Sequence, residues 1–520
     1  MNNPPSSPLS PELHGVTVLR ITLAGSFCYD RSVGQRTGTA PVSLAGGAAL
    51  LAALSALSGL DRDECISYLV GLRHWSGQTL YQSFFIPHGP VAGMVFAFFL
   101  RLMPTGGWAL VAASASLNAA AAITVWRILR KAIGDDRAAL AGGWMTAFWF
   151  VPVFGAFYHD HLAYFWGLLA LAAWQENEDW GAWIAGILIA LCFHTKQTVG
   201  LSVLAAFVIG ISLEQKTDRL RKQTFLALKG LLLCHALIFL SLWAAGLSGR
   251  YWLYNVIYPW RFARLAPEEK GIQAVFSGLL IPFHIQPLTM IKDWGWGRLA
   301  FYPIVIAVYL GYASMFRKAR PGFPFVVALF STVLGAALLG RLHAHLFFGM
   351  AIVIVFLAYR WRWSPAIWTG YAMLGLAYTY HLHGHIHPTD PFFSQTDLRP
   401  IRIATNAQSQ SSEVIVRYLE SHPSPFALLG DASDLILLAL RKAPWNPSVN
   451  FTQLTIPADP DRLEQWQNDF LNALFSHEVR QIVVERKYLV SLPKITDFLK
   501  HHCREVNLGG EPLLLFTRVL

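Results

Sequence analysis

The sequence has few charged residues for its length. Only 14% of its 520 residues are Asp, Glu, Lys or Arg, while 54% are hydrophobic, and the mean hydropathy is +0.40. Soluble globular domains carry about 25% charged residues, so this shortage excludes an ordinary water-soluble protein. The composition is typical of a chain that crosses a membrane many times.

Cysteine is also scarce. The five cysteines are scattered without a CxxC pair, at Cys28, Cys65, Cys192, Cys234 and Cys503. This spacing excludes a disulfide framework and a cysteine-rich zinc site. The first fifteen residues are rich in Pro and Ser, and no basic segment precedes an apolar one there, so we do not expect a signal peptide.

The basic residues are in excess, with a net charge of +10, but they are not gathered on one surface. They occur in short clusters between apolar runs, as at Arg127 to Arg137 and at Arg317 to Arg320. Such clusters orient helices in a bilayer, because basic loops stay on the cytoplasmic side. We therefore expect membrane lipids around the chain and no nucleic-acid partner.

The apolar runs predict about eleven membrane-spanning helices. The run from His88 to Met103 is predicted to lie along the membrane surface, because counting it as a span would move the later basic clusters outside. The spans are expected near residues 41–60, 107–126, 138–157, 162–175, 181–197, 199–213, 225–246, 298–316, 323–340, 343–359 and 364–381.

This pattern divides the chain into three parts. A cytoplasmic tail at 1–40 precedes a transmembrane part at 41–382, which carries an outer loop at 61–106. The polar remainder, 383–520, alternates apolar runs at 426–430, 481–484 and 513–516 with helix-like segments at 461–475 and 494–501. The predicted fold is a polytopic α-helical membrane protein with a C-terminal extracytoplasmic α/β domain.

Two adjacent acids, Asp63 and Glu64, directly follow the first predicted span. A carboxylate placed there could act as a general base on an incoming hydroxyl group. The alternative is structural, because Asp61 or Asp63 could simply cap a helix that begins at Glu64.

A third acid, Asp160, stands between His159 and His161, in what we expect to be a loop between two spans. Carboxylate and imidazole groups together suit a divalent cation such as Mn, Mg or Zn, and they could also orient an acceptor. Because the spacing matches no closed metal site, a polar loop without metal is the alternative.

Several cationic residues are also predicted at or near membrane depth. Lys196 lies between two apolar runs, and a buried Lys requires an anionic partner, either a protein carboxylate or a lipid phosphate. The predicted topology brings it to the same face as the acids, together with His88, Arg341, His343 and His345. Carboxylates for an acceptor and cations for a phosphate leaving group are what sugar transfer from a lipid-linked phosphosugar needs.

Three segments of the outer loop resemble the corresponding loop of the GT-C superfamily, namely Leu60 to Tyr68, Ser76 to Tyr81 and Phe85 to Pro90. These integral-membrane glycosyltransferases include the protein O-mannosyltransferases of the family 39 type and the aminoarabinose transferases that act on lipid A. The Asp160 segment, Gly186 to Lys196 and Gly340 to Phe348 follow in the order found in that superfamily, so the resemblance covers roughly residues 40–380.

The resemblance implies an inverting glycosyltransferase of the cell membrane, and the predicted topology puts its active site on the extracytoplasmic face. Its donor would be a polyprenyl-phosphate sugar, and its acceptor a lipid, a glycan or a protein. By the resemblance, Asp63 would be the general base and Asp160 the second acid of the outer loops. From the residues themselves, we expect Glu64 and Asp160, with His159 and His161, to orient the acceptor or a metal. By the resemblance, the donor phosphate would be bound by Lys196, Arg341 and His345, and from their predicted position on the same face we expect His343 and His88 to contribute.

Two other function classes stay open at this stage. A transporter or flippase of lipid-linked sugars would also use buried cations, although the inverted repeat of many transporters is not visible in the sequence. In a non-catalytic scaffold, the acids would be helix caps and the C-terminal part would be functional. Transfer activity that depends on Asp63 would separate these readings.

Overall fold

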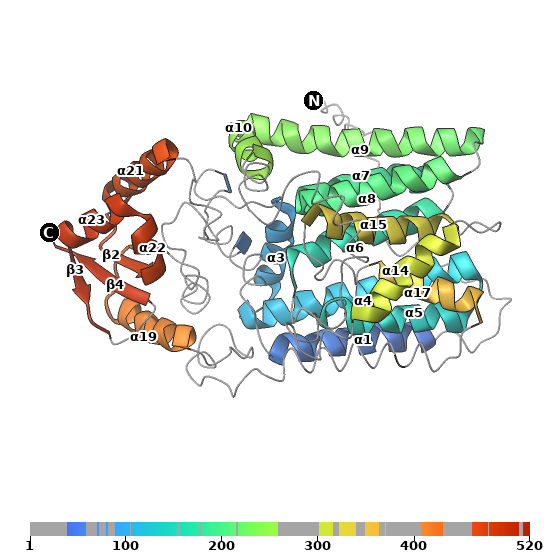
Figure 1. Ribbon diagram of the computed structural model, residues 1–520, viewed down its shortest axis with the longest axis horizontal. Coiled ribbons are helices and arrows are strands. Elements are labelled where there is room, and N and C mark those ends of the chain that lie inside the picture. Colours follow the sequence, from blue (N-terminus) through green and yellow to red (C-terminus); the bar gives the residue numbers. More distant parts are fainter. Residues whose placement is uncertain are drawn as a thin grey trace, which may run out of the picture.

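The computed structural model describes residues 39–58, 70–71, 80–81, 89–103, 106–152, 157–176, 178–214, 217–257, 301–315, 322–339, 349–362, 370, 407–429, 460–476, 478–508 and 513–519. Most of them form a bundle of helices, and a small sheet with its own helices lies beyond one end of the bundle (Figure 1).

The described bundle helices are mostly apolar around their whole circumference, as expected for helices packed in a membrane. They are α1 (Thr39–Ser58), α3 (Val91–Leu102), α4 (Gly106–Ile133), α5 (Asp136–Trp149), α6 (His159–Gln175), α7 (Asp179–Thr195), α8 (Gln197–Leu213), α9 (Asp218–Ala244), α10 (Ser248–Trp252), the π-helical turn η2 (Leu253–Ile257), α14 (Phe301–Met315), α15 (Phe323–Leu339) and α17 (Met350–Arg360).

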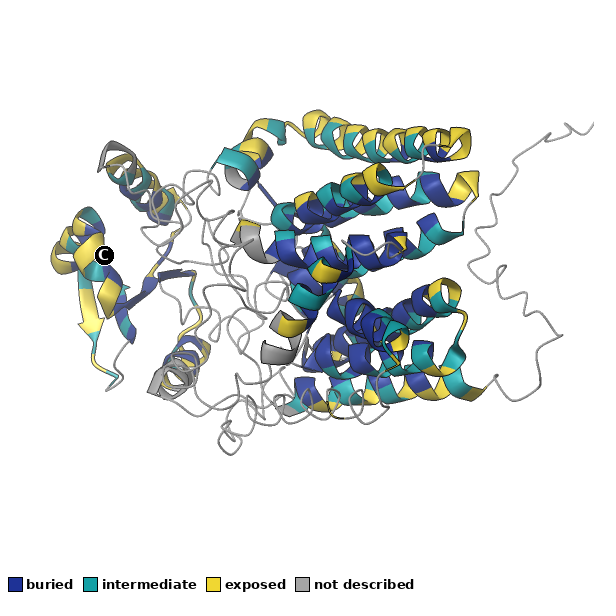
Figure 2. Ribbon diagram, turned by 45° about the vertical axis from the view of Figure 1, so that its right-hand side comes forward, coloured by how far each residue is buried: buried dark blue, intermediate teal, exposed yellow. Residues whose placement is uncertain are grey.

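Neighbouring helices in the chain pack against each other. Helix α4 contacts α1, α5 and α6, helix α7 contacts α6, α8 and α9, and α15 packs on α8 and α17. Dark buried residues fill the interior of this bundle, whereas α9 shows exposed and half-buried residues along its length (Figure 2). Only 6% of the apolar stretch of α9 is buried inside the protein, which is consistent with a lipid-facing helix.

Three of the described helices are long and apolar enough to cross a membrane, namely Thr39–Leu57, Gly107–Ile133 and Asp218–Ala244. Other apolar helices are shorter, such as α7 and α8 with 17 residues each, or about 25 Å at ~1.5 Å per residue. The number of about eleven spans therefore stays a prediction. Helix α3, with 12 residues, is too short to cross alone, and it runs across the direction of the bundle helices (Figure 1).

Several predicted helix boundaries were wrong. Helix α5 ends at Trp149 instead of near 157, because Pro152 follows and cannot continue a helix. Helix α3 begins at Val91 instead of His88, with Pro90 as its N-cap residue. Helix α4 continues to Ile133, beyond the predicted end at 126, because Arg and Lys are good helix formers. The predicted span at 343–359 contains most of α17, which begins at Met350, and its residues 343–348 lie outside the described part of the chain.

Three surface ion pairs lie together at one end of the bundle. Arg127 and Lys131 of α4 contact Glu176, just after α6, at 2.8 Å and 3.1 Å. Lys222 near the start of α9 contacts Asp179 at the start of α7 at 2.5 Å. Since consecutive helices run in opposite directions, the start of α6 and the end of α7 lie at the opposite end of the bundle.

The C-terminal part contains a four-stranded sheet in the order β1-β2-β4-β3. Strand β1 (Phe426–Leu429) is parallel to β2 (Gln481–Glu485), while β4 (Leu513–Arg518) is antiparallel to both β2 and β3 (Cys503–Val506). The helices of this part are α19 (Ala407–Ser421), α21 (Pro460–Ser476), α22 (Arg486–Ser491) and α23 (Pro493–His502).

Three of these strands and two of the helices coincide with segments predicted from the sequence. Strand β3 was missed, because it is an edge strand whose central residues, Arg504 and Glu505, are exposed and give no apolar signal. The core of this part lies between the sheet and its helices, and it includes Phe470, Ile482 and Leu499.

Helices α7 and α9 approach each other closely through two glycines. A Cβ atom on Gly186 would lie 1.9 Å from the Ala227 carbonyl oxygen, and a Cβ atom on Gly230 would lie 2.1 Å from that of Trp183. Small residues allow such backbone contact between membrane helices. This crossing holds the end of α7, with His194 and Thr195, against α9.

Replacing Gly186 with Ala should therefore force α7 and α9 apart. We expect a loss of about 1–3 kcal/mol in the free energy of unfolding, seen as a lower apparent Tm in detergent. The matched control is Gly46→Ala on α1, where a Cβ atom would meet nothing within 4 Å. An equal Tm for both variants would contradict the close crossing.

Candidate functional site

Helices α7 and α8 are separated by a single residue, Lys196. Its backbone is extended, with φ −149° and ψ 116°, whereas Thr195 and Gln197 are helical. The Lys196 N–H donates to the Cys192 carbonyl at 2.9 Å, and its own carbonyl accepts from the Gly200 N–H at 2.9 Å. Both helices are therefore hydrogen-bonded up to this residue, which turns the chain back between two buried helix ends.

The Lys196 side chain forms a buried ion pair with Asp160 of α6. Lys196 Nζ lies 2.5 Å from Asp160 Oδ1, and only 10% and 2% of the two side chains are exposed. His159 completes the cluster, because its Nε2 lies 3.2 Å from the same Asp160 oxygen and 3.4 Å from Lys196 Nζ. The sequence predicted that this lysine pairs with either a protein carboxylate or a lipid phosphate. In the structure its partner is a protein carboxylate.

Asp160 occupies the first turn of α6, not a loop between spans as predicted from the sequence. Tyr158 is extended and precedes the helix, so His159, Asp160 and His161 are already helical. A carboxylate in the first turn interacts favourably with the positive end of the helix dipole. This interaction explains why the helix starts three residues earlier than its apolar run.

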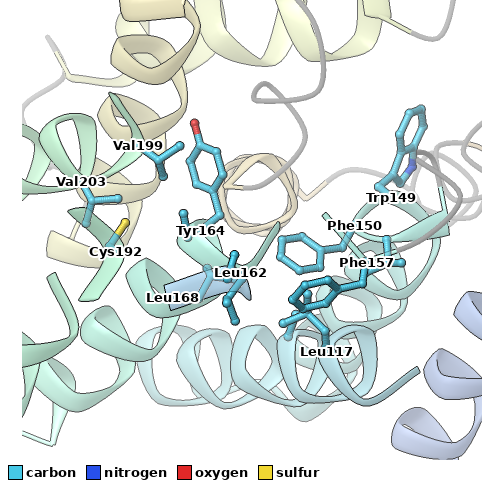
Figure 3. Packing of buried hydrophobic residues seen from close by; sticks show 14 of the residues in the cluster. Leu117, Trp149, Phe150, Phe157, Leu162, Tyr164, Leu168, Cys192, Val199 and Val203 are labelled. Atoms are coloured by element: carbon cyan, nitrogen blue, oxygen red, sulfur yellow. The ribbon is translucent and has the colours of Figure 1, made fainter. Parts of the chain in front are cut away.

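The ion pair lies in apolar surroundings. Figure 3 shows the α6 side chains Leu162, Tyr164 and Leu168 between two apolar groups, with Leu117, Phe150 and Phe157 on one side and Cys192, Val199 and Val203 on the other. Charges interact more strongly in such a medium than in water. The same medium makes an isolated charge costly, so Lys196 and Asp160 depend on each other.

His161 belongs to a different environment. Two residues along a helix turn the side chain by about 200°, and the fully buried His161 ring packs against the Phe150 ring at 5.3 Å between centroids. The three consecutive residues that the sequence grouped as one candidate site therefore contact different side chains, although the Tyr158 ring lies next to both imidazoles, 3.9 Å from His159 and 6.1 Å from His161 between centroids. His159 and Asp160 join Lys196, and His161 packs next to Phe150.

The sequence also predicted a divalent cation at Asp160, and the surroundings of this carboxylate can be compared with what a bound cation would need. The Lys196 ammonium group already occupies the position next to the Asp160 oxygen where a cation would bind. Within the described ranges, no three His, Cys, Asp or Glu residues are grouped to hold a metal ion. A metal requirement stays a prediction.

The segment before α3 contacts the backbone of the α7–α8 junction. Gly89 N–H donates to the Thr195 carbonyl at 3.2 Å. A Cβ atom on Gly89 would lie 1.6 Å from the His194 carbonyl oxygen, so only glycine fits here. The other predicted site residues lie outside the described part of the chain, namely Asp63, Glu64, His88, Arg341, His343 and His345.

Sequence reasoning missed a second polar network on the other side of the junction. The two ring nitrogens of His194 lie 2.8 Å from Tyr251 Oη and 2.8 Å from His235 Nδ1. Gln197 Nε2 donates to Asn255 Oδ1 at 2.7 Å. The available signal was the polar run His194 to Thr198 between two apolar helices, since polar groups at this depth need partners.

Residues 87–243 match the sequence model of a family described as dolichyl-phosphate-mannose-protein mannosyltransferase. The resemblance to the GT-C membrane glycosyltransferases is confirmed. The matched segment includes Asp160 and Lys196 and extends from the start of α3 to the end of α9. No curated protein is significantly similar to this chain in sequence.

Three solved structures share part of its chain path. An oligosaccharyltransferase of Archaeoglobus fulgidus, in complex with Zn and sulfate, has 14% identity and a TM-score of 0.47, over 92% of this chain and 73% of its own. ArnT from Cupriavidus metallidurans, bound to undecaprenyl phosphate, has 14% identity and a TM-score of 0.43, over 93% and 98%. The mycobacterial arabinofuranosyltransferase AftD has 13% identity and a TM-score of 0.49, over 92% and 40%. Similarities of this size do not identify the activity of this chain.

Removing one member of the ion pair should destabilise the protein more than removing both. Lys196→Met leaves the Asp160 carboxylate buried without its counter-ion, which costs about 3–5 kcal/mol. In the double variant Lys196→Met/Asp160→Asn no uncompensated charge remains, so the apparent Tm should recover part of the loss. The measurement is a double-mutant cycle on thermal unfolding in detergent. Additive Tm losses would show that the two side chains do not stabilise each other.

Proposed function

We propose that this protein is a membrane glycosyltransferase that moves a sugar from a polyprenyl-phosphate-linked donor to an acceptor hydroxyl, with inversion at C1. The observation that carries the proposal is the buried cluster of Lys196, Asp160 and His159. It lies within the segment that matches the mannosyltransferase family, whose description names a lipid phosphate sugar.

The reaction needs a base for the acceptor and a cation for the leaving group. The acceptor hydroxyl gives its proton to the Asp63 carboxylate while its oxygen forms a bond to C1 of the sugar. The bond between C1 and the donor phosphate oxygen breaks on the opposite face, and the electron pair stays on the phosphate. Lys196 would neutralise that developing negative charge, which is the kind of electrostatic term that contributes most to catalysis.

The other site residues have supporting roles in this proposal. Asp160, His159 and Glu64 orient the acceptor. Further contacts to the donor phosphate come from Arg341, His343, His345 and His88, and the C-terminal part shapes the acceptor side.

The distribution of charge supports an extracytoplasmic location for the cluster. The basic residues Arg127, Lys131 and Lys222 lie at one end of the bundle, and Lys196 with Asp160 at the other. The length of α6 separates the two ends by about 25 Å. Because basic loops stay in the cytoplasm, we place the cluster at the outer face of the cell membrane.

The test is transfer of radiolabelled sugar from a panel of polyprenyl-phosphate sugars, in membranes that contain the wild type or one variant. Asp63→Asn should lower the rate by about 10²–10⁴-fold with donor binding retained, since that is the usual contribution of a general base. Lys196→Met should lower transfer and donor binding together. A parallel series with a chelator decides whether a metal is needed.

The matched control is Asp218→Asn, an acid with a fully exposed side chain at the start of α9, at the other end of the bundle. It should transfer sugar at the wild-type rate. Equal transfer by wild type and Asp63→Asn would remove Asp63 from the chemistry. Donor binding by the wild type without transfer of any sugar would favour a transporter or flippase.

A further inference from the structure

Four consecutive residues at the α7–α8 junction each contact a different segment of the chain. His194 pairs with His235 of α9 and Tyr251 of α10, and the Thr195 carbonyl accepts from Gly89. Lys196 binds Asp160 and Gln197 binds Asn255. His194 and Gln197, which flank Thr195 and Lys196, therefore both contact the segment that follows α9.

Both of these connections lead to Tyr81. From Gln197, the path continues through Asn255, whose Nδ2 donates to Tyr81 Oη at 2.7 Å. From His194, it continues through Tyr251, whose ring packs edge-on against the Tyr81 ring at 5.4 Å between centroids. The two paths start on either side of Lys196 and meet at one side chain.

Tyr81 itself has an unusual backbone. It is a non-glycine residue with φ of 65°, in the left-handed region that costs free energy, and its side chain is almost fully buried. Arg250 Nη1 donates to its carbonyl at 3.1 Å. The ring contact, the hydroxyl hydrogen bond and the carbonyl hydrogen bond together hold this conformation. Strained residues held in this way are found preferentially at functional sites.

Asn255 also lies in an irregular element, the π-helical turn η2. Its amide donates both to Tyr81 Oη and to the Tyr251 carbonyl at 3.2 Å, and it accepts from Gln197. A π-helical turn shifts side chains relative to an α-helix and occurs often at functional sites. Here the turn brings one amide group into contact with all three neighbours.

We propose that Tyr81, Asn255 and Gln197 form a positioning clamp for Lys196. The clamp fixes Lys196 relative to the outer-loop segment at Tyr81. The position of the Lys196 ammonium group relative to this segment therefore stays constant during sugar transfer. This inference rests on the proposed function of Lys196. Tyr81 and Asn255 act through Lys196 and not on the reacting atoms.

The first part of the test compares Tyr81→Phe and Gln197→Leu, which remove one link each from the same path. Each should lower kcat for sugar transfer about tenfold, with a much smaller change in KM, because sub-ångström displacement of a charged group weakens transition-state stabilisation. Because the links act in series, the double variant should be no slower than either single variant. Thr124→Val, which also removes one buried side-chain hydrogen bond but on α4, is the matched control and should keep the wild-type rate.

The second part does not depend on activity. Leu80→Cys, in a background without the natural cysteines, places a thiol at a position that is 4% exposed in the wild type. In detergent, the thiol should react slowly with a small maleimide and at least about tenfold faster when Gln197→Leu is added, because the opened clamp adds a population in which the thiol is reachable.

The two parts separate failure of the clamp from failure of the proposed function. Unchanged labelling on addition of Gln197→Leu would overturn the clamp, whether or not the wild type transfers sugar. Faster labelling with unchanged kcat, or rate losses that multiply in the double variant, would show that the path does not position Lys196. If the wild type transfers no sugar from any donor, faster labelling would support the clamp and the proposed function alone would fail.

Discussion

The structure of the site depends on one constraint, the single extended residue between α7 and α8. A lysine at this place cannot withdraw into water, because two helix ends and α6 surround it. Its charge must be balanced where it stands, and Asp160 balances it at 2.5 Å. His159 contacts both members of this pair, and Gly89 is hydrogen-bonded to the backbone next to Lys196.

The polar contacts of the junction fit together with the close backbone contacts. Gly186 and Gly230 let α7 approach α9, and this approach brings His194 within hydrogen-bond distance of His235. Gly89 brings the segment before α3 onto the carbonyls of the junction. Buried polar groups that are fully hydrogen-bonded specify one arrangement, whereas partly satisfied groups would permit several. Such rigidity suits a site in which an acceptor and a phosphate must be held at fixed distances.

Sequence reasoning found Lys196 and Asp160 individually, because ionisable residues between apolar runs are conspicuous. It could not show that they are in contact, since 36 positions of sequence separation contain no distance information. His194, Gln197 and Asn255 were missed because their importance lies in their partners, which only the packing of α7, α8 and η2 reveals. The expected loop around Asp160 is the first turn of α6, because favourable helix electrostatics extended the helix beyond its apolar run. Strand β3 was missed for the opposite reason, since its pairing with β4 outweighs its polar sequence.

The role of Lys196 in donor binding is tested most directly by a crystal structure of the protein with a polyprenyl phosphate bound. We expect the phosphate to lie within hydrogen-bond distance of Lys196 Nζ, about 3 Å, at the end of the bundle opposite Arg127 and Lys131. A phosphate bound elsewhere, with the Lys196–Asp160 pair intact and remote from it, would contradict the assignment of this cluster to sugar transfer.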